Sequence, residues 1–411
     1  MPFVRITNNR EVPVITMTSV KSMKYRRVVS NVGRFVVPIL FILGLTFESA
    51  RFENKAKEEL IISMGTTSIR QSQITPIAFK PWPSNANLPC FPPNERWKEL
   101  AIQNTPSATG FLYLKPYKTG SSTASGINIR IARNVARQQG KQFELCKTRN
   151  DHGPTFTPGK DLFHDRSKSD SVLWTIIREP THRAISAFFH FGVTRHGIEP
   201  SDENFKEYLQ SNHHPMTDYY LHALRTNRSA TFRRGKDDPA MVVNEILQDF
   251  NFIGITERMD ESIIVLMMLL NLTISDVMYL SAKKHGGLDD GGGPTGCALI
   301  VPSFVSPEME LFLQSKEWKD QIQNDEDLYN AVNQSLDLTI EALGKVKFQE
   351  NLEMLQLANQ RATYECEDKV SFPCTVAGAR RRSSNETDCM WNDSGCGFDC
   401  LDSVATKLGL R

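Results

Sequence analysis

Two short segments of the chain combine basic and hydroxyl side chains in the way that anion-binding sites do. The first, KPYKTGSST, runs from residue 115 to 123 and contains Lys118, Gly120 and four hydroxyl residues. The second, REPTHRAIS, runs from residue 178 to 186 and contains two arginines and a serine. Lysine supplies a point charge, glycine lets the backbone approach closely, and an arginine fork with a hydroxyl suits a phosphate monoester. Both segments therefore predict binding of anionic groups.

The first segment lies between an expected strand, Phe111–Leu114, and an expected helix from Ala124 to about Arg137. A helix N-terminus after a tight loop presents backbone N–H groups and the positive end of the helix dipole to an anion. The segment is not a Walker A loop, because its lysine precedes the glycine instead of following it. We interpret it as an anion loop that needs no metal. The alternative is an ordinary Gly/Ser turn capped by serine.

The second segment directly follows an expected strand, Val172–Ile177. Arg178 would then lie at the carboxyl end of a strand, where α/β sheets bind ligands. Pro180 suits the first turn of a helix, and Arg183 and Ser186 share one face of that helix because they are three residues apart. The alternative is a helix start whose arginines lie on the surface.

The elements that must position these segments alternate between strand and helix. Besides those named above, we expect a strand at Gln142–Cys146, a helix from about Thr181 to Phe191, a strand at Phe252–Ile255, and helices at about Asp260–Leu272 and within Pro307–Gln360. Strand, loop and helix recurring in this order predict an α/β fold with a central parallel sheet flanked by helices.

The composition is that of a folded globular protein. The chain has 411 residues, of which 40% are hydrophobic and 23% charged, enough for one large or two ordinary domains. Its 48 basic and 47 acidic residues give a formal net charge of +1. This balance offers no general attraction to nucleic acid, and we expect no nucleic-acid partner.

The N-terminus carries the pattern of a membrane anchor. An apolar run, Phe35–Phe47, follows a basic stretch, and counting from Val28 gives a length that spans a bilayer if Arg34 snorkels. The basic flank would stay in the cytoplasm. We predict a cytoplasmic basic tail at 1–27 and a transmembrane signal anchor at 28–50, hence a type II membrane protein with a lumenal body. The alternatives are a cleaved signal sequence and a buried helix.

Two further regions fit a lumenal protein. Residues 51–106 become rich in proline and predict a stem, whereas residues 361–411 hold five of the eight cysteines. Such a tail is usually stapled by disulfides in an oxidising compartment, and it lacks the CxxC pairs and histidines of zinc sites. Its disulfide pairing stays open. Five glycosylation sequons begin at Asn227, Asn271, Asn333, Asn385 and Asn392.

Together and in this order, the two anion segments resemble the 5′-phosphosulfate and 3′-phosphate loops of sulfotransferases that use 3′-phosphoadenosine 5′-phosphosulfate (PAPS). The sequence is most similar to the Golgi carbohydrate sulfotransferases, especially the galactose-3-O-sulfotransferase group, and more distantly to the uronyl and heparan 2-O-sulfotransferases. The resemblance covers roughly residues 110–345, with looser matches at Phe252–Ser262, Asp276–Leu280 and Asp327–Ala331. It implies a P-loop-like sulfotransferase domain at 107–360.

The resemblance also implies roles for individual residues. The 5′-phosphosulfate would be held by Lys118, Thr119, Gly120, Ser121, Ser122 and Thr123, and the 3′-phosphate by Arg178 and Ser186. Lys118 would also act catalytically by stabilising charge on the bridging oxygen, so that no metal is required. The reaction would be in-line transfer of a sulfuryl group to a glycan hydroxyl in the Golgi lumen. The acceptor would be a galactose- or uronate-type sugar of a glycolipid, glycoprotein or polysaccharide.

A sugar hydroxyl is a weak nucleophile, so the reaction calls for a general base. Members of the family place a histidine or glutamate between the second strand and the second anion loop, where this chain has His152 and His164. We favour His152, because it follows the expected strand more closely; an ordinary surface histidine is the alternative. His182 and His190 are expected on the surface of the helix that follows.

Two other functions fit part of the sequence. A P-loop-like kinase would use ATP and magnesium, but the order of lysine and glycine in the first loop argues against it. A non-catalytic lumenal glycan-binding protein would have no need for the charged and hydroxyl residues that both loops keep. The arginines between residues 195 and 240 are interpreted as a solvated face. The sequence leaves the acceptor sugar, its hydroxyl position and the oligomeric state open.

Overall fold

The computed structural model describes residues 76–84, 110–140, 149–151, 163, 166, 168–169, 171–212, 215–225, 237–282, 288–289, 298–366 and 397–411. All of these residues belong to one compact unit, Gln73–Arg411. Among them, no helix is long and apolar enough to span a membrane. The anchor expected at 28–50 lies outside the described residues.

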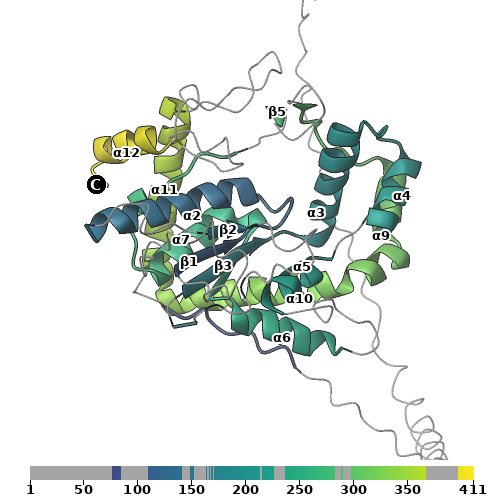
Figure 1. The fold of residues 1–411 in the computed structure, drawn as a ribbon, viewed down its shortest axis with the longest axis horizontal. Helices are drawn as coiled ribbons and strands as arrows, with labels where there is room; N and C mark the ends of the chain where they lie inside the picture. Colours follow the sequence, from purple (N-terminus) through teal and green to yellow (C-terminus); the bar gives the residue numbers. More distant parts are fainter. Residues whose placement is uncertain are drawn as a thin grey trace, which may run out of the picture. The chain divides into compact units, whose positions relative to one another are not determined.

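A four-stranded parallel sheet forms the centre of the fold (Figure 1). Its strands are β1 (Gly110–Leu114), β2 (Arg149–Asp151), β3 (Ser171–Ile177) and β4 (Phe252–Ile255), arranged in the order β2–β1–β3–β4. Strands β1, β3 and β4 are buried along their whole length, as expected for strands covered on both faces. Because β1 pairs with β3 in parallel, the two loops that leave their carboxyl ends are neighbours.

The α/β fold with a central parallel sheet is confirmed, and three of the four expected strands appear where their apolar runs predicted them. The strand expected at Gln142–Cys146 lies outside the described residues. In the part that the structure describes, the neighbour of β1 on that side is β2, whose sequence Arg-Asn-Asp has no apolar residue.

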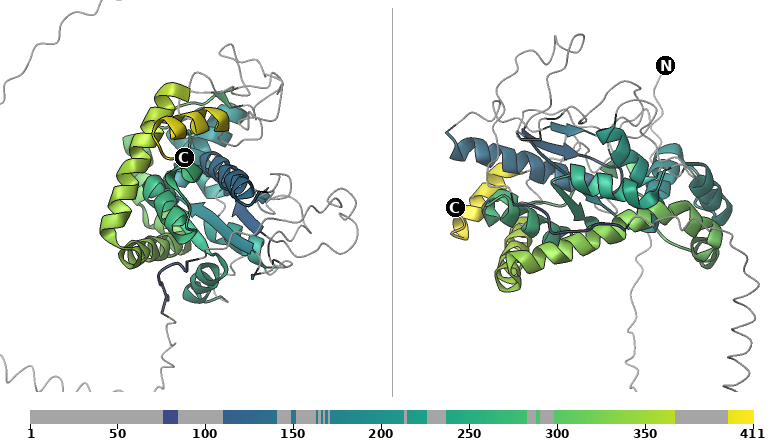
Figure 2. Two further views of the ribbon diagram at one scale, coloured as in Figure 1. Left: turned by 90° about the vertical axis from the view of Figure 1, so that its left-hand side faces the viewer. Right: turned by 90° about the horizontal axis from the view of Figure 1, so that it is seen from below.

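Helices lie on both faces of the sheet; in Figures 1 and 2 (left), α2 lies above the strands and α6 and α10 below them. In chain order the helices are α2 Ser121–Gln138, α3 Pro180–Ala187, the π-helix η3 Phe188–Arg195, α4 Asp202–Asn212, α5 Met216–Leu224, α6 Pro239–Asp249, the 3₁₀ helix η5 Thr256–Arg258, α7 Met259–Leu269, α8 Ile274–Val277, α9 Pro307–Gln314, α10 Lys316–Leu343, α11 Lys345–Cys366 and α12 Phe398–Lys407. A short antiparallel pair, β5 (Leu288–Asp289) and β6 (Ala298–Leu299), lies between α8 and α9 in the sequence.

Helix α3 begins in a way that the sequence explains. The Glu179 side chain caps it by accepting hydrogen bonds from the N–H groups of Thr181 and His182, and Pro180 occupies the first turn. The expected helix from Thr181 to Phe191 does not continue in α form, because the chain changes to the wider π-helix η3 at Phe188. A side-chain carbon on Gly192 would come within 3.2 Å of the Phe188 ring, so glycine allows this close packing.

Two hydrophobic clusters hold the elements together. The larger surrounds the sheet and includes Trp174, whose indole N–H donates to Asn128 of α2 at 2.7 Å. The smaller joins α3 and η3 to α4, α9 and the start of α10, around Phe188 and Trp318. Because α3 carries the second anion segment, the packing of this cluster fixes the position of that segment relative to the sheet.

Part of the range expected as a stem packs on this domain. Asn244 of α6 pairs with the backbone of Pro76 and Ala78, and the backbone N–H of Trp82 donates to the Thr339 hydroxyl of α10 at 2.9 Å. The Trp82 ring is buried, 6.0 Å from that of Phe252 in β4. Figure 2 (left) shows this segment, in purple, passing α6 and α10. Residues 76–84 are therefore part of the folded unit.

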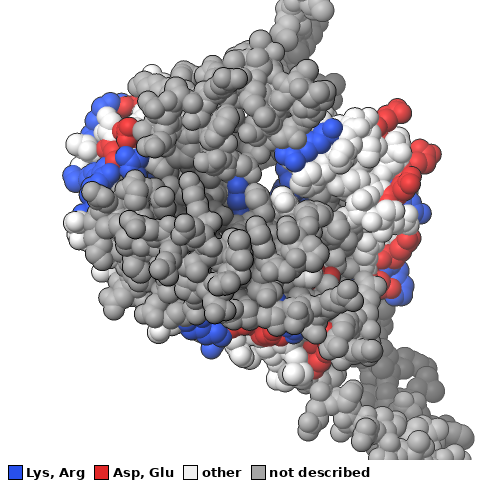
Figure 3. Space-filling view, viewed as in Figure 1, with Lys and Arg blue, Asp and Glu red and all other residues white. Residues whose placement is uncertain are grey.

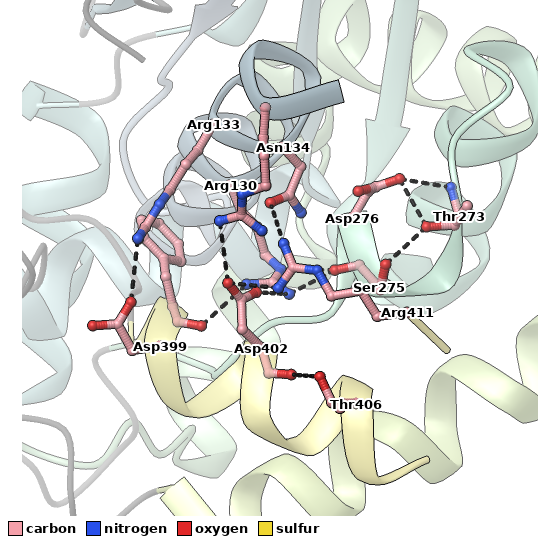
Figure 4. A network of polar contacts seen from close by, with 12 residues as sticks. Arg130, Arg133, Asn134, Thr273, Ser275, Asp276, Asp399, Asp402, Thr406 and Arg411 are labelled. Atoms are coloured by element: carbon pink, nitrogen blue, oxygen red, sulfur yellow. Dashed lines mark hydrogen bonds and ion pairs between the residues drawn. The ribbon is translucent and has the colours of Figure 1, made fainter. Parts of the chain in front are cut away.

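The C-terminal helix α12 is fastened to the domain by a disulfide and a polar network. Cys400 is bonded to Cys366 at the end of α11. Arg130 of α2, only 1% exposed, forms an ion pair with Asp402 at 2.9 Å and donates to the backbone carbonyl of Ser275 (Figure 4). These contacts fix the helix that begins at the first anion loop. The expected cysteine-rich tail at 361–411 thus contains helical parts at both ends, with residues 367–396 outside the described chain.

Candidate anion-binding site

The first anion segment forms a tight loop between β1 and α2. Lys118 and Gly120 have positive φ angles of 64° and 69°. A side-chain carbon on Gly120 would lie 3.1 Å from the Met259 Cε atom, so both the backbone conformation and the packing favour glycine here. Gly120 is also the N-cap of α2, which excludes the alternative of a serine-capped turn. The N-cap offers no side-chain oxygen to the first N–H groups of α2, which is the arrangement that favours an anion.

The hydroxyl residues of this loop divide into two groups. Ser121 and Ser122, at the start of α2, line a cleft. Thr119 is fully buried and donates its hydroxyl to the Pro116 carbonyl at 3.1 Å. Thr123 accepts a hydrogen bond from the backbone N–H of Ala282 at 2.9 Å. The two threonine side chains therefore stabilise the loop and its surroundings.

The second anion segment meets the first directly. Arg178, the first residue after β3, donates from Nη1 to the Lys118 carbonyl at 3.2 Å, and its Nε lies 3.6 Å from a carboxylate oxygen of Glu257. Burial lowers the pKa of Arg178, and the negative charges of Glu257 and Glu179 oppose that shift. The guanidinium stays charged because an arginine pKa begins far above neutrality.

The second arginine of the segment has a different environment. Arg183 is buried, and its Nε donates to the Tyr117 carbonyl at 3.2 Å. Burial lowers its pKa, an effect that the carboxylate of Asp325 opposes. Arg178 and Arg183 thus each hold one carbonyl of the first loop, but only Arg178 reaches the cleft.

Both segments line one cleft of about 350 Å³. Its lining comes from the first loop, the second loop, η3, one residue after α8 and the chain that follows β6: Tyr117, Lys118, Gly120, Ser121, Ser122, Arg178, Ser186, Phe189, His190, Phe191, Arg195, Ala282, Ile300, Val301 and Ser303. Figure 3 shows lysine or arginine side chains at the hollow of this face, and side chains of both charges toward its outer edge. A concave site with hydroxyls and cations at several points suits a ligand with more than one anionic group.

A larger cleft, of about 580 Å³, lies along α6. Its lining mixes Lys168 and Arg225 with Asp237, Asp238, Glu245 and Asp249. Arg225 pairs with Glu245, and Lys168 with Asp249, so much of the charge in this cleft is neutralised. It contains neither anion loop, and we place the candidate site in the smaller cleft.

His190 was expected on a helix surface, and that expectation is wrong. It is 6% exposed and lines the cleft, with its ring edge-on to Phe191. The guanidinium of Arg195 lies over the Phe191 ring, 5.3 Å from its centre. The π-helix changes the angle between successive side chains, and a period of 3.6 residues does not anticipate it. His182 is largely exposed, as expected.

The residues expected to act as general base, His152 and His164, lie outside the described residues. Strand β2 ends at Asp151, so His152 is the next residue of the chain after the strand beside β1. Among the described residues, no group of three or more His, Cys, Asp or Glu side chains is arranged to hold a metal ion.

Comparison with known proteins gives one relative of known activity. The chain is 26% identical over 329 residues to galactosylceramide sulfotransferase of Mus musculus, a match that covers 69% of this chain and 71% of that protein. No protein-family model matches the chain, and no solved structure matches it. The relative supports the resemblance that the two anion loops suggested.

Proposed function

From the relationship of this chain to the Golgi carbohydrate sulfotransferases, we propose that it transfers a sulfuryl group from PAPS to a hydroxyl of a glycan. One observation carries the proposal beyond the relationship itself. The two segments expected to bind the two ends of the donor, 60 residues apart in sequence, contact each other and line a single cleft. A decayed site gives no reason for this pairing of cationic and hydroxyl residues, and the order of lysine and glycine in the first loop argues against a kinase.

The donor set of the cleft fits a nucleotide that is anionic at two positions. We assign Lys118, Gly120, Ser121 and Ser122, with the N-terminus of α2, to the 5′-phosphosulfate. Thr119 and Thr123 support that loop through the contacts of their hydroxyls. Arg178 and Ser186 are assigned to the 3′-phosphate, because a guanidinium and a hydroxyl match a phosphate monoester.

When bound, PAPS supplies an activated sulfuryl group. Lys118 stabilises the negative charge that develops on the bridging oxygen as the S–O bond to the nucleotide breaks. His152 accepts the proton of the sugar hydroxyl while the new S–O bond forms. The carbonyl contacts of Arg178 and Arg183 keep the first loop in place, so that positioning is established before the acceptor arrives.

The acceptor is proposed to be a galactose- or uronate-type sugar. The relative is named for galactosylceramide, which favours a galactose-bearing glycolipid as the first acceptor to test. The proposed location is the Golgi lumen, with a single N-terminal anchor at residues 28–50.

The test is thermal stabilisation of the full chain by 3′-phosphoadenosine 5′-phosphate (PAP), compared with ATP plus magnesium. A ligand at 100 times its dissociation constant adds about 2.7 kcal/mol to the free energy of unfolding. We expect PAP to stabilise the wild-type chain. The variants Lys118→Ala and Arg178→Ala should lose this stabilisation, and they should also lose the ability to sulfate galactosylceramide. Stabilisation by ATP and magnesium alone would favour a kinase. A folded chain that responds to neither ligand would favour a non-catalytic glycan-binding protein.

A further inference from the structure

The turn that follows β4 connects the two anion loops. The Thr256 hydroxyl lies 2.7 Å from the carbonyl oxygen of Thr119 in the first loop and 2.9 Å from that of Ile177 at the end of β3. A side-chain carbon on Gly120 would also touch the Thr256 methyl group, at 3.4 Å. This turn is therefore a third part of the candidate site, although it does not line the cleft.

The next residue, Glu257, places a carboxylate beside the arginine of the second loop. Its oxygens accept hydrogen bonds from the Glu179 backbone N–H at 3.3 and 3.2 Å, and one of them lies 3.6 Å from the Arg178 Nε. The Tyr329 hydroxyl donates to the other oxygen at 3.5 Å. Burial and Glu257 raise the pKa of Tyr329 to about 12, so this hydroxyl keeps its proton at neutral pH.

The contacts of Arg178 are not all made by Glu257. Its Nη1 is also held by the Lys118 carbonyl, and three quarters of the side chain is buried. The orientation of the guanidinium therefore has support without the carboxylate. The positive charge of the guanidinium, unlike its orientation, does depend on Glu257, because a phosphate bound to Arg178 would share that charge with the carboxylate. The two negative groups would also repel each other, and the phosphate, which is not part of the chain, is the one that can leave.

We propose that Glu257 limits the affinity of Arg178 for the 3′-phosphate and thereby promotes release of the bisphosphate product. Glu257 acts through the charge of Arg178 and is not a catalytic residue. The inference rests on the proposed function, because it assumes that Arg178 binds the 3′-phosphate. It adds a property that the two loops do not predict, namely a carboxylate in a site for a highly anionic ligand.

The variant Glu257→Gln tests this. Glutamine has nearly the same shape, and its side-chain oxygen can still accept from the Glu179 N–H, while the negative charge is lost. We expect PAP to bind roughly three- to tenfold more tightly, the range for removing one partly exposed charge from beside an anion. Calorimetric titration of the full chain with PAP measures this. In turnover, the KM for PAPS should fall and kcat should fall with it, because product leaves more slowly.

Two variants serve as controls. Glu261→Gln makes the same change one turn further on, where the carboxylate pairs with Arg258, and should leave PAP affinity unchanged. Glu257→Asp keeps the charge and should not tighten binding. Unchanged or weaker PAP binding by Glu257→Gln, with wild type and Glu261→Gln binding normally, would show that the carboxylate only orients Arg178 and would overturn the inference alone. A folded wild-type chain that does not bind PAP would overturn the proposed function and this inference together.

Discussion

The buried side chain of Arg183 donates a hydrogen bond to the backbone carbonyl of Tyr117, 66 positions earlier in the chain. Arg178, five residues before it, makes the equivalent contact with the Lys118 carbonyl from a partly exposed position beside the cleft. Two arginines of one segment thus hold successive carbonyls of the same loop. Their surroundings differ: Arg183 is buried and holds the loop, whereas Arg178 lines the cleft, where we propose that it binds the ligand.

Arg183→Met should destabilise the protein. The change removes the donor to Tyr117 and also the buried positive charge that interacts with the carboxylate of Asp325. We expect a loss of about 2–4 kcal/mol in the free energy of unfolding, measured by urea denaturation. Arg133→Met is the matched control, because its ion pair with Asp399 is exposed and should contribute less than about 1 kcal/mol. Equal effects in both variants would contradict the structural role of Arg183.

Gly120→Ala should impair both stability and donor binding. Alanine is strained at a φ of 69°, and its methyl group would also press on Met259. Gly140→Ala separates the two effects, because Gly140 has a similar φ of 63° and no neighbouring atom within 4 Å of the added carbon. We expect a cost of about 1 kcal/mol for Gly140→Ala and a larger one for Gly120→Ala. Only the latter should weaken PAP binding in a titration.

His152→Ala should abolish turnover while donor affinity is largely kept. A general base contributes about 10²–10⁴-fold to the rate, and the residues that we assign to donor binding lie in the two loops. Sulfation of galactosylceramide and titration with PAP measure the two properties separately. The exposed His196 provides a control, since its replacement by alanine should change neither. Weakened PAP binding with normal turnover would exclude the role of His152 as base.

Trp82→Ala should destabilise the domain although residue 82 lies in the range expected as a stem. The side chain is 6% exposed and packs against Phe252 of the central sheet. Loss of a buried tryptophan costs about 3–5 kcal/mol, which thermal unfolding would detect. Phe79→Ala, on the same segment but 42% exposed, should have a smaller effect. A wild-type melting temperature in Trp82→Ala would mean that the segment does not dock.

The sequence predicts the parts of this fold that follow from local pattern. The apolar runs at 111–114, 172–177 and 252–255 form strands, and the basic and hydroxyl residues after the first two meet in one cleft. Three features lack such a pattern. Strand β2 is short and polar, the π-helix turns His190 into the cleft, and Trp82 packs from a proline-rich segment. Each depends on contacts between distant parts of the chain.

Glu257 illustrates the same limit within the site. Its segment contributes to the family resemblance, but nothing in its spacing indicates that its carboxylate lies 3.6 Å from the Arg178 Nε. That distance results from the pairing of β3 with β4, which brings the residues after both strands together. Sequence patterns identify residues with suitable chemistry, whereas the strand order determines which of them become neighbours.

The docking of residues 76–84 limits the distance between the cleft and a membrane that holds the N-terminus. With an anchor at 28–50, as proposed, a stem of residues 51–106 would be a linker of 56 residues between the membrane and the folded domain. Because Ala78 and Trp82 are hydrogen-bonded to the domain, the linker is reduced to the 25 residues from 51 to 75. Fully extended, these reach roughly 85 Å. On such a tether the proposed enzyme would stay within that distance of its own bilayer, which agrees with the glycolipid acceptor proposed above.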